Sequence, residues 1–167
     1  MRRQRRFLRE NGLVSRVVTV GVYGWTSEAL LEALRRSRVR RLLDVRQRRG
    51  VRRSEYAWAN AKWLEAALVD AGIEYEHRSE LAPTTELRQL QYREDDRVGV
   101  GKRSRTELAD EYVRRYTSEI LDRADLSTIP DRSALLCVER DPEACHRSLI
   151  AERLAAKHGV SVRHLRP

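Results

Sequence analysis

The feature that most constrains this chain is an alternation of short apolar runs with longer amphipathic stretches along almost its whole length. The apolar runs are typical of strands, and their lack of polar alternation indicates burial on both faces. They lie at residues 17–22, 41–45, 73–75, 134–138 and 160–165. Stretches with helical spacing separate them, at 26–34, 59–71, 107–124 and 143–158. This alternation predicts a mainly parallel sheet covered by helices.

We therefore predict a three-layer α/β fold of the doubly wound, Rossmann-like type, with about five strands and helices on both faces of the sheet. A single domain spans residues 17–167, and a basic arm, 1–16, precedes it. The polar segment 77–104 contains Pro83 and two closely spaced glycines, which indicates a lid-like insertion or a loop with some helix.

Parallel strands of such a sheet end at one edge, where ligands bind. In the commonest arrangement the first strand is central, and the chain crosses to its other side after the third strand, so that the first and fourth strands are neighbours. Residues 21–26, 44–53 and 139–147 then meet in one crevice, although they are far apart in the sequence.

Cys145, His146 and Arg147 follow the fourth strand, where a helix is expected to begin. Free N–H groups at a helix start favour a thiolate or a bound anion. Arg147 adds a donor fork for phosphate or carboxylate, and His146 can exchange a proton with the Cys145 thiol or a leaving group. The alternative is that Cys145 packs as a small buried hydrophobe and His146 is a hydrogen-bonded structural residue.

Two carboxylates occupy corresponding places at strand ends, Glu139 after the fourth strand and Asp44 in the second. Glu139 suits a general acid or base, and the pair together suits glycosidic-bond chemistry. A structural role is the alternative for both, and it is favoured for Asp44, as a partner of Arg46 or of a helix-end N–H group.

Five arginines crowd the eight residues that follow the second strand. They are Arg46, Arg48, Arg49, Arg52 and Arg53, and Arg46, Arg49 and Arg52 are our candidates for binding an anionic substrate. Tyr23 and Trp25, after the first strand, are candidates for contact with a substrate ring. The alternatives are a solvated arginine loop and a tryptophan that packs in the core.

Several classes of site lack their sequence signals. No Walker loop is present, and the glycines around Val22 and Tyr23 lack the spacing of a dinucleotide fingerprint. Cys137 and Cys145 are eight residues apart, which favours reduced thiols over a structural disulfide, and neither the cysteines nor the histidines have metal-ligand spacing. We therefore predict no cofactor and no metal.

Charge points to an anionic partner. The formal net charge is +9, and residues 1–16 hold six arginines and one glutamate. Such an arm suits nucleic acid or a nucleotide, although a basic terminus also arises from composition bias alone. No window has the length and apolar content of a membrane-spanning helix or a secretory signal, so we predict a cytoplasmic protein with no membrane partner.

Four segments together resemble the DUF488 family of small α/β domains. They are 19–24, 43–46, 71–75 with His77 and Leu81, and 134–139 leading to Cys145-His146-Arg147. The resemblance implies a common fold and crevice, with Asp44, Arg46 and Glu139 beside the Cys-His-Arg motif as site residues. It implies no particular reaction, and this sequence departs from the family pattern after Arg46.

Our leading hypothesis is an enzyme acting on nucleic acid or a nucleotide, of the hydrolase or lyase type. It binds an anionic group at the Cys145-His146-Arg147 helix start and uses Glu139 or Cys145 for chemistry. One alternative is a non-catalytic nucleic-acid-binding module, in which the same arginines only bind phosphate. Another is a small-molecule enzyme of specialised metabolism, in which the basic arm is incidental.

Overall fold

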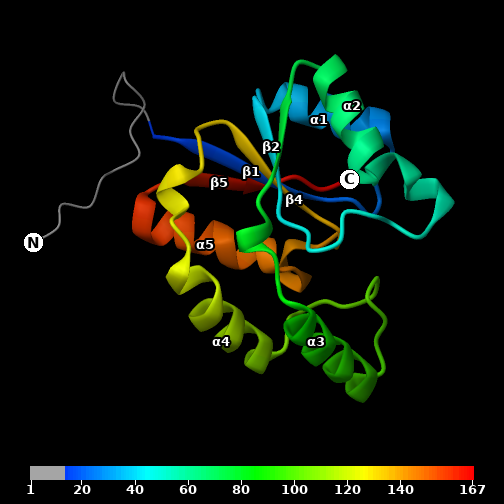
Figure 1. The fold of residues 1–167 in the computed structure, drawn as a ribbon, viewed down its shortest axis with the longest axis vertical. Helices are drawn as coiled ribbons and strands as arrows, with labels where there is room; N and C mark the ends of the chain where they lie inside the picture. The colour runs from blue at the N-terminus through cyan, green and yellow to red at the C-terminus, as the bar shows by residue number, and fades with distance from the viewer. Residues whose placement is uncertain (1–13) are drawn as a thin grey trace, which may run out of the picture.

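The computed structural model describes residues 14–167, which form a five-stranded sheet with helices on both faces (Figure 1). Every neighbouring pair of strands is parallel, which confirms the predicted α/β class. The strands are β1 (Arg16–Gly21), β2 (Arg41–Asp44), β3 (Glu74–His77), β4 (Ser133–Cys137) and β5 (Ser161–His164). Residues 1–13 of the predicted arm lie outside the described residues, and Arg16 is the first residue of β1.

The strand order along the sheet is β3-β2-β4-β1-β5, so β4 lies at the centre. The expectation of a central first strand is wrong, although β1 and β4 are neighbours, with Gly21 paired to Cys137. All residues of β4 are buried. A strand between two helix layers must be apolar on both faces, and β4 has the most apolar sequence of the five, which explains its central place.

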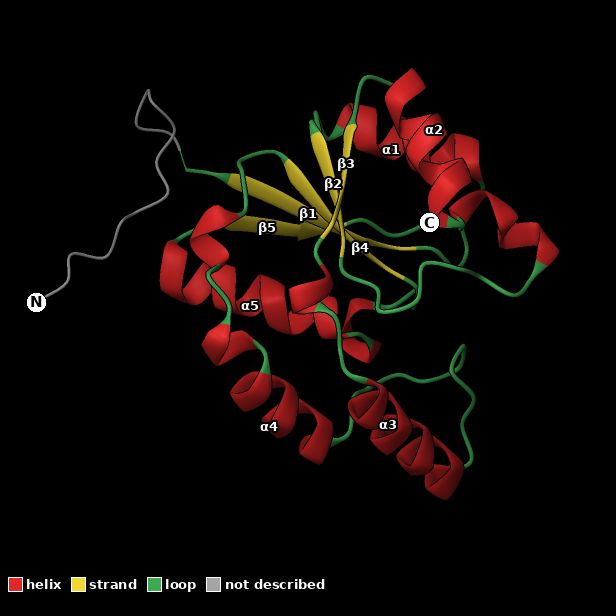
Figure 2. Cartoon of the chain, in the orientation of Figure 1, coloured by secondary structure: helices red, strands yellow, loops and turns green. Residues whose placement is uncertain are grey.

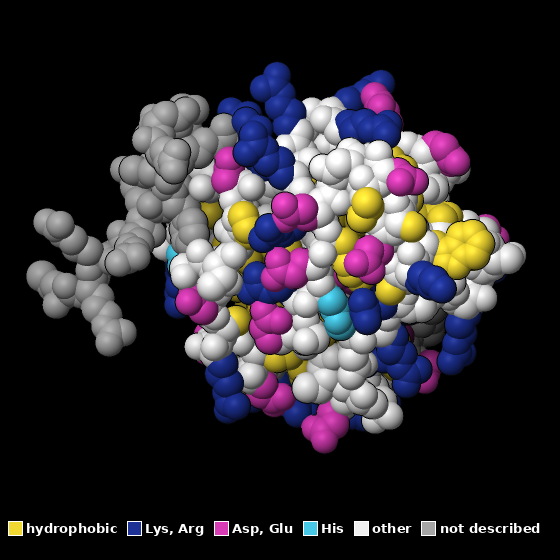
Figure 3. All heavy atoms as spheres, turned by 45° about the horizontal axis from the view of Figure 1, so that its top comes forward, with side chains coloured by type: hydrophobic (Ala, Val, Ile, Leu, Met, Phe, Trp, Pro, Cys, Tyr) yellow, Lys and Arg dark blue, Asp and Glu magenta, His cyan; other side chains and the backbone are white. Residues whose placement is uncertain are grey.

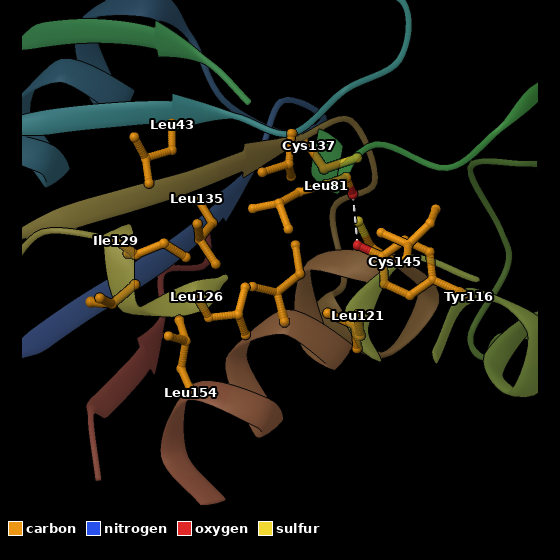
Figure 4. Close-up of a cluster of buried hydrophobic side chains, with 14 of the residues drawn as sticks. Leu43, Leu81, Tyr116, Leu121, Leu126, Ile129, Leu135, Cys137, Cys145 and Leu154 are labelled. Carbon is orange, nitrogen blue, oxygen red and sulfur yellow. Dashed lines mark hydrogen bonds between the residues drawn. The ribbon is translucent and has the colours of Figure 1, made fainter. Parts of the chain in front are cut away.

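Two helices cover one face of the sheet and three cover the other (Figure 2). Within residues 14–167 they are α1 (Ser27–Arg36), α2 (Ala61–Asp70), α3 (Thr85–Val98), α4 (Asp110–Glu119) and α5 (His146–His158). α1 and α2 pack over Val20 and Leu42, whereas α5 packs on the other face of the sheet, near Leu135 (Figure 4). α4 packs against α5, and α3 packs against α4. In this part of the chain no helix is long and apolar enough to cross a bilayer.

Local signals set several helix ends. The Thr26 hydroxyl accepts a hydrogen bond from the Ala29 N–H at 3.2 Å and caps α1. α5 ends at Gly159, whose φ of 63° is left-handed. It begins later than predicted, at His146, because a 3-10 turn over Pro142–Ala144 comes first. Cys145 is therefore the residue that precedes the first turn of α5.

The polar segment 77–104 contains a regular helix, α3, capped by the Thr84 hydroxyl and ended by Gly99. Its apolar period is hard to see in the sequence because two of its buried positions, Gln91 and Asp95, are polar. They are paired inside the protein: the Gln91 amide donates to Asp95 at 2.9 Å, and the Arg105 guanidinium bonds Asp95 at 2.9 Å. A polar core contact therefore takes the place of part of the apolar pattern.

Candidate active site at the carboxyl ends of the strands

The carboxyl ends of β1, β2 and β4 open into a cavity of about 530 Å³, which we call the strand-end pocket. Tyr23 follows β1, the 46–53 loop follows β2 and Glu139 follows β4, and all three line the pocket. Residues from α3, from the 102–105 segment and from α4 line its other side. The three segments that the sequence analysis expected in one crevice thus meet here.

Two thiols and an imidazole lie together in the pocket wall. We call Cys137, Cys145 and His146 the thiol–histidine cluster; all three side chains are buried and line the pocket. His146 Nδ1 lies 3.7 Å from the Cys137 sulfur and 3.8 Å from the Cys145 sulfur. Figure 4 shows Cys137 at the end of β4 and Cys145 ahead of α5, so two elements of the fold hold the cluster.

The His146 ring has a defined orientation. Its Nε2 lies 2.9 Å from the Val45 carbonyl oxygen, and the Tyr116 ring packs against it at a centroid distance of 5.4 Å. Because a carbonyl oxygen only accepts hydrogen bonds, Nε2 carries the hydrogen of this bond. Nδ1 is therefore the nitrogen that faces the two sulfurs.

The two thiols differ in acidity. Burial raises the pKa of both, and for Cys137 it acts together with the charge of Cys145 to hold the pKa well above its usual range. At Cys145, the adjacent Cys137 thiol and the positive charges of Arg147 and His146 outweigh burial, so its pKa lies well below its usual range. Burial lowers the pKa of His146, but the Cys145 thiolate more than offsets this and raises it. Cys145 is thus the more acidic thiol of the pair.

Glu139 lies beside the cluster, where the Cys137 thiol donates to its Oε2 at 3.3 Å. Burial, together with the negative charge of Cys145, raises the pKa of Glu139, against the opposing charges of Lys102 and His146. An ion-pair contact to Arg105 at 3.5 Å joins the carboxylate to the far wall of the pocket. Glu139 therefore lies between the cluster and two cationic side chains.

Arg147 lies behind this wall and does not line the pocket. Its side chain is fully buried and donates to the carbonyls of Glu139 at 2.6 Å and Arg140 at 3.0 Å, and to the Thr19 hydroxyl at 3.2 Å. The neighbouring Gly21 must be glycine, because a Cβ there would lie 1.7 Å from the Glu139 oxygen. Arg147 thus fastens the loop that carries Glu139, and it acts on the pocket only through its charge.

Asp44 and Arg46 form a buried ion pair. Arg46 donates to both oxygens of Asp44, at 2.8 Å and 2.7 Å, and to the Ala59 carbonyl at 2.8 Å. The Tyr75 hydroxyl donates to Asp44 at 2.7 Å, and Arg49 donates to Tyr75 at 3.3 Å. Asp44 and Arg49 do not line the pocket, whereas Arg46 does. This network holds the start of the arginine loop, which gives Asp44 the structural place favoured for it.

The pocket lining is strongly cationic. Among residues 14–167, its basic residues are Arg46, Arg48, Arg52, Arg53, Arg88, Lys102, Arg103 and Arg105, and Glu139 is its one acidic residue. Arg53 pairs with Glu55, and Arg103 lies over the Tyr23 ring at 4.9 Å. Within residues 14–167, the side chains of Arg48 and Arg52 make no hydrogen bond or ion pair, and both are exposed. Elsewhere on the surface acidic side chains interrupt the basic ones, as in the face shown in Figure 3.

The two aromatic candidates have different places. Tyr23 lines the pocket, with Tyr56 packed against it at a centroid distance of 5.2 Å. Trp25 is outside the pocket and packs against the cluster beneath α1 and α2, which is the alternative considered for it. Its ring therefore contributes to the core.

Three functional candidates were missed from the sequence. Lys102 belongs to the polar segment 77–104, Arg105 directly follows it, and Cys137 was assigned to the core. A signal for Cys137 exists, because it lies two residues before Glu139 at the end of a strand and so shares a face with it. The three residues of the cluster have no metal-ligand spacing in the sequence, since they meet only across the turn between β4 and α5.

Comparison with known proteins identifies the family. The model of the DUF488 family, a domain of unknown function, matches residues 26–154. Searches of curated proteins and of solved structures found no match. Since the match covers most of the sequence, the chain belongs to the DUF488 family.

Proposed function

We propose that this DUF488 protein is an enzyme that acts on a nucleotide, free or as a unit of a nucleic acid, bound in the strand-end pocket. Its phosphate lies against the arginines of the 46–53 loop, and its sugar or base lies beside Glu139 and the thiol–histidine cluster. The observation that carries the proposal is that one cavity is lined both by many cationic side chains and by Glu139, Cys145 and His146.

The charge balance of the lining supports an anionic substrate. Eight basic residues and one acidic residue surround a cavity of about 530 Å³, a volume typical of a small-molecule site. Arg48 and Arg52 are exposed, and no side chain in the described part of the chain engages their donor groups. Guanidinium groups bind phosphate with paired hydrogen bonds, so these two are suited to hold it.

Aromatic rings support a nucleotide among anionic substrates. Tyr23, Tyr92 and Tyr112 line the same cavity. A nucleobase stacks on such rings, which an inorganic or carboxylate ligand does not require. A pocket with both arginines and tyrosines therefore fits the two chemically different ends of a nucleotide.

The reacting group is Glu139 or Cys145. Glu139 is positioned to donate or accept a proton at a leaving group, as glycosidic-bond cleavage requires. Cys145 is positioned to attack an electrophilic carbon, with His146 as its proton partner. Both residues line the pocket, so either can contact a bound substrate.

A panel of nucleotides and short nucleic acids tests the proposal, with binding followed by calorimetry and products by chromatography. We expect binding at moderate salt and turnover that Glu139→Gln or Cys145→Ser reduces by at least about 100-fold, the usual contribution of a positioned acid, base or nucleophile. Glu143→Gln is the matched control, since this exposed carboxylate lies in the same loop outside the pocket.

Absence of binding to every nucleotide and nucleic acid would refute the proposal. The alternative is a non-catalytic nucleic-acid-binding module, which the exposed Arg48 and Arg52 also favour. The two variants distinguish it from an enzyme. If nucleic acid binds but no product forms, and neither Glu139→Gln nor Cys145→Ser changes anything measurable, the protein is a binding module.

A further inference from the structure

We infer that Cys137, Cys145 and His146 form a binding site for a single divalent metal ion of the zinc type, whose fourth coordination position faces the strand-end pocket. The two sulfurs and His146 Nδ1 are the protein ligands. The inference goes beyond the proposed function and does not depend on a nucleotide substrate. With the ion bound, Cys145 and His146 serve as ligands, so that of the two candidate reacting groups Glu139 is the one that acts.

The spacing of the three ligand atoms fits a tetrahedral ion. Zinc binds sulfur at about 2.3 Å and imidazole nitrogen at about 2.0–2.1 Å, so tetrahedral angles put a sulfur and a nitrogen ligand about 3.6 Å apart. The two sulfur–nitrogen distances here are 3.7 Å and 3.8 Å. All three ligand atoms lie within 4.8 Å of one another, whereas two sulfurs bound to a tetrahedral zinc are about 3.8 Å apart, so one ion between them reaches every ligand after side-chain shifts of at most about 1 Å.

The imidazole is already oriented as a ligand. His146 Nε2–H donates to the Val45 carbonyl at 2.9 Å, which directs the lone pair of Nδ1 toward the sulfurs. Metal-binding histidines almost always make such a bond with their second nitrogen, because it sets the tautomer and the ring angle. The structure thus supplies both the imidazole ligand, His146, and the carbonyl of Val45 that orients it.

The site has rigid support and a route for entry. Cys137 ends the central strand, while Cys145 and His146 begin α5, so no ligand comes from a long loop. All three residues line the pocket, which connects them to solvent. In the described part of the chain, this is the one group of three or more potential metal ligands.

The chemistry of the donors selects the ion. Two thiolates and one imidazole favour zinc over magnesium or calcium, which prefer oxygen. Two thiolates also neutralise the charge of the ion, which matters in a buried site. Three protein ligands and one open position are typical of a catalytic zinc, and the combination of His, two Cys and a nearby non-ligand Glu is the one found in zinc deaminases of nucleobases. Glu139, whose Oε2 is 3.3 Å from the Cys137 sulfur, is the nearby carboxylate here, and it lines the same pocket.

The test uses the full-length chain, reduced and without a histidine tag, with the metal alone as the probe. After dialysis against zinc and then metal-free buffer, we expect about one zinc per chain by elemental analysis. Cobalt in place of zinc should give a thiolate-to-cobalt charge-transfer band and the strong visible bands of a tetrahedral site. Folded wild-type protein without these bands would overturn the inference, and this readout needs no variant.

Variants then assign the ligands. Cys137→Ala, Cys145→Ala and His146→Ala should each lower the metal affinity by at least about tenfold, whereas His158→Ala, at the other end of α5, should not. Glu139→Gln should keep the metal, since Glu139 is not a ligand. Metal retained by Cys145→Ala, or lost by a folded Glu139→Gln, would contradict the assignment.

The outcome is independent of the proposed function. Nucleotide binding without any metal uptake would refute the metal site and leave the nucleotide pocket standing. Metal uptake at the cluster without nucleotide binding would support the metal site and refute the proposed nucleotide pocket.

Discussion

Two pairs of arginines near the pocket differ in what surrounds them. Arg46 and Arg147 are buried, and their donor groups bond to Asp44 and to backbone carbonyls. Arg48 and Arg52 are exposed at the pocket, without a bond to any side chain among residues 14–167. From the sequence, Arg46, Arg52 and Arg147 were alike candidates for binding an anion. An arginine close to a site can therefore hold the site together rather than bind its ligand.

The strongest effect is expected for Asp44→Ala, which leaves the buried Arg46 charge without its partner. Removal of one member of a buried ion pair costs about 3–5 kcal/mol. Urea denaturation measures the loss. The double variant Asp44→Ala with Arg46→Met should recover much of it, since both charges are then gone. A cost below about 1 kcal/mol for Asp44→Ala would contradict the buried position of Arg46, because a buried guanidinium that loses its carboxylate must destabilise the fold.

The next largest loss of stability is expected for Arg147→Met. It leaves the carbonyls of Glu139 and Arg140 and the Thr19 hydroxyl without a donor, for a cost of about 3 kcal/mol in the free energy of unfolding. The matched control is Arg140→Met, an exposed neighbour whose loss should stay within about 0.5 kcal/mol. Equal effects of the two variants would contradict a fastening role for Arg147.

Substitution of the exposed Arg48 and Arg52 should weaken nucleotide binding without lowering stability. Arg48→Ser with Arg52→Ser should leave the unfolding free energy within about 0.5 kcal/mol of wild type and weaken nucleotide binding about tenfold. Arg35→Ser with Arg93→Ser removes the same charge from exposed positions outside the pocket and is the control. If both double variants weaken binding equally, net charge and not the pocket holds the ligand.

The smallest effect concerns Tyr75, whose hydroxyl donates to Asp44. Tyr75→Phe should cost about 1 kcal/mol at neutral pH. Burial raises the pKa of Tyr75 to about 12, against about 10 in an unfolded chain. Tyr75 therefore keeps its proton to a higher pH in the folded state than in the unfolded state. Its contribution to stability is complete below pH about 10 and is lost as the pH rises toward about 12. The variant should lack that loss, and denaturation curves at pH 9 and 11 would reveal a failure of this expectation.

Much of the fold was predictable because its signals are local. The apolar run that became β4, the Thr26 cap of α1 and the Gly159 end of α5 each depend on neighbouring residues in the sequence. Strand order was not predictable in this way, since it depends on which strand gains most from burial on both faces. α3 was obscured because Gln91 and Asp95 occupy buried positions, and their partners, among them Arg105, are in other segments.

Some residues of the candidate site could likewise be recognised from the sequence, and others could not. Glu139, Cys145 and His146 could be selected from the sequence because residue type and position at a strand-to-helix junction together indicate chemistry. Cys137, Lys102 and Arg105 could not, because a residue becomes part of a pocket through the side chains opposite it. The roles of Arg147 and Trp25 were likewise open, since burial and bond partners decide them.

By itself, the sequence determined the α/β class, the approximate elements and the edge of the sheet at which the site lies. Periodicity and strand ends are properties of the backbone, and they need no knowledge of distant contacts. Only the tertiary structure decided which groups face the pocket. It brought Cys137 to Cys145 and His146, turned Arg46 and Arg147 inward, and left Arg48 and Arg52 facing solvent. The physical reason is that a side chain's role depends on the neighbours that satisfy its hydrogen bonds and charge.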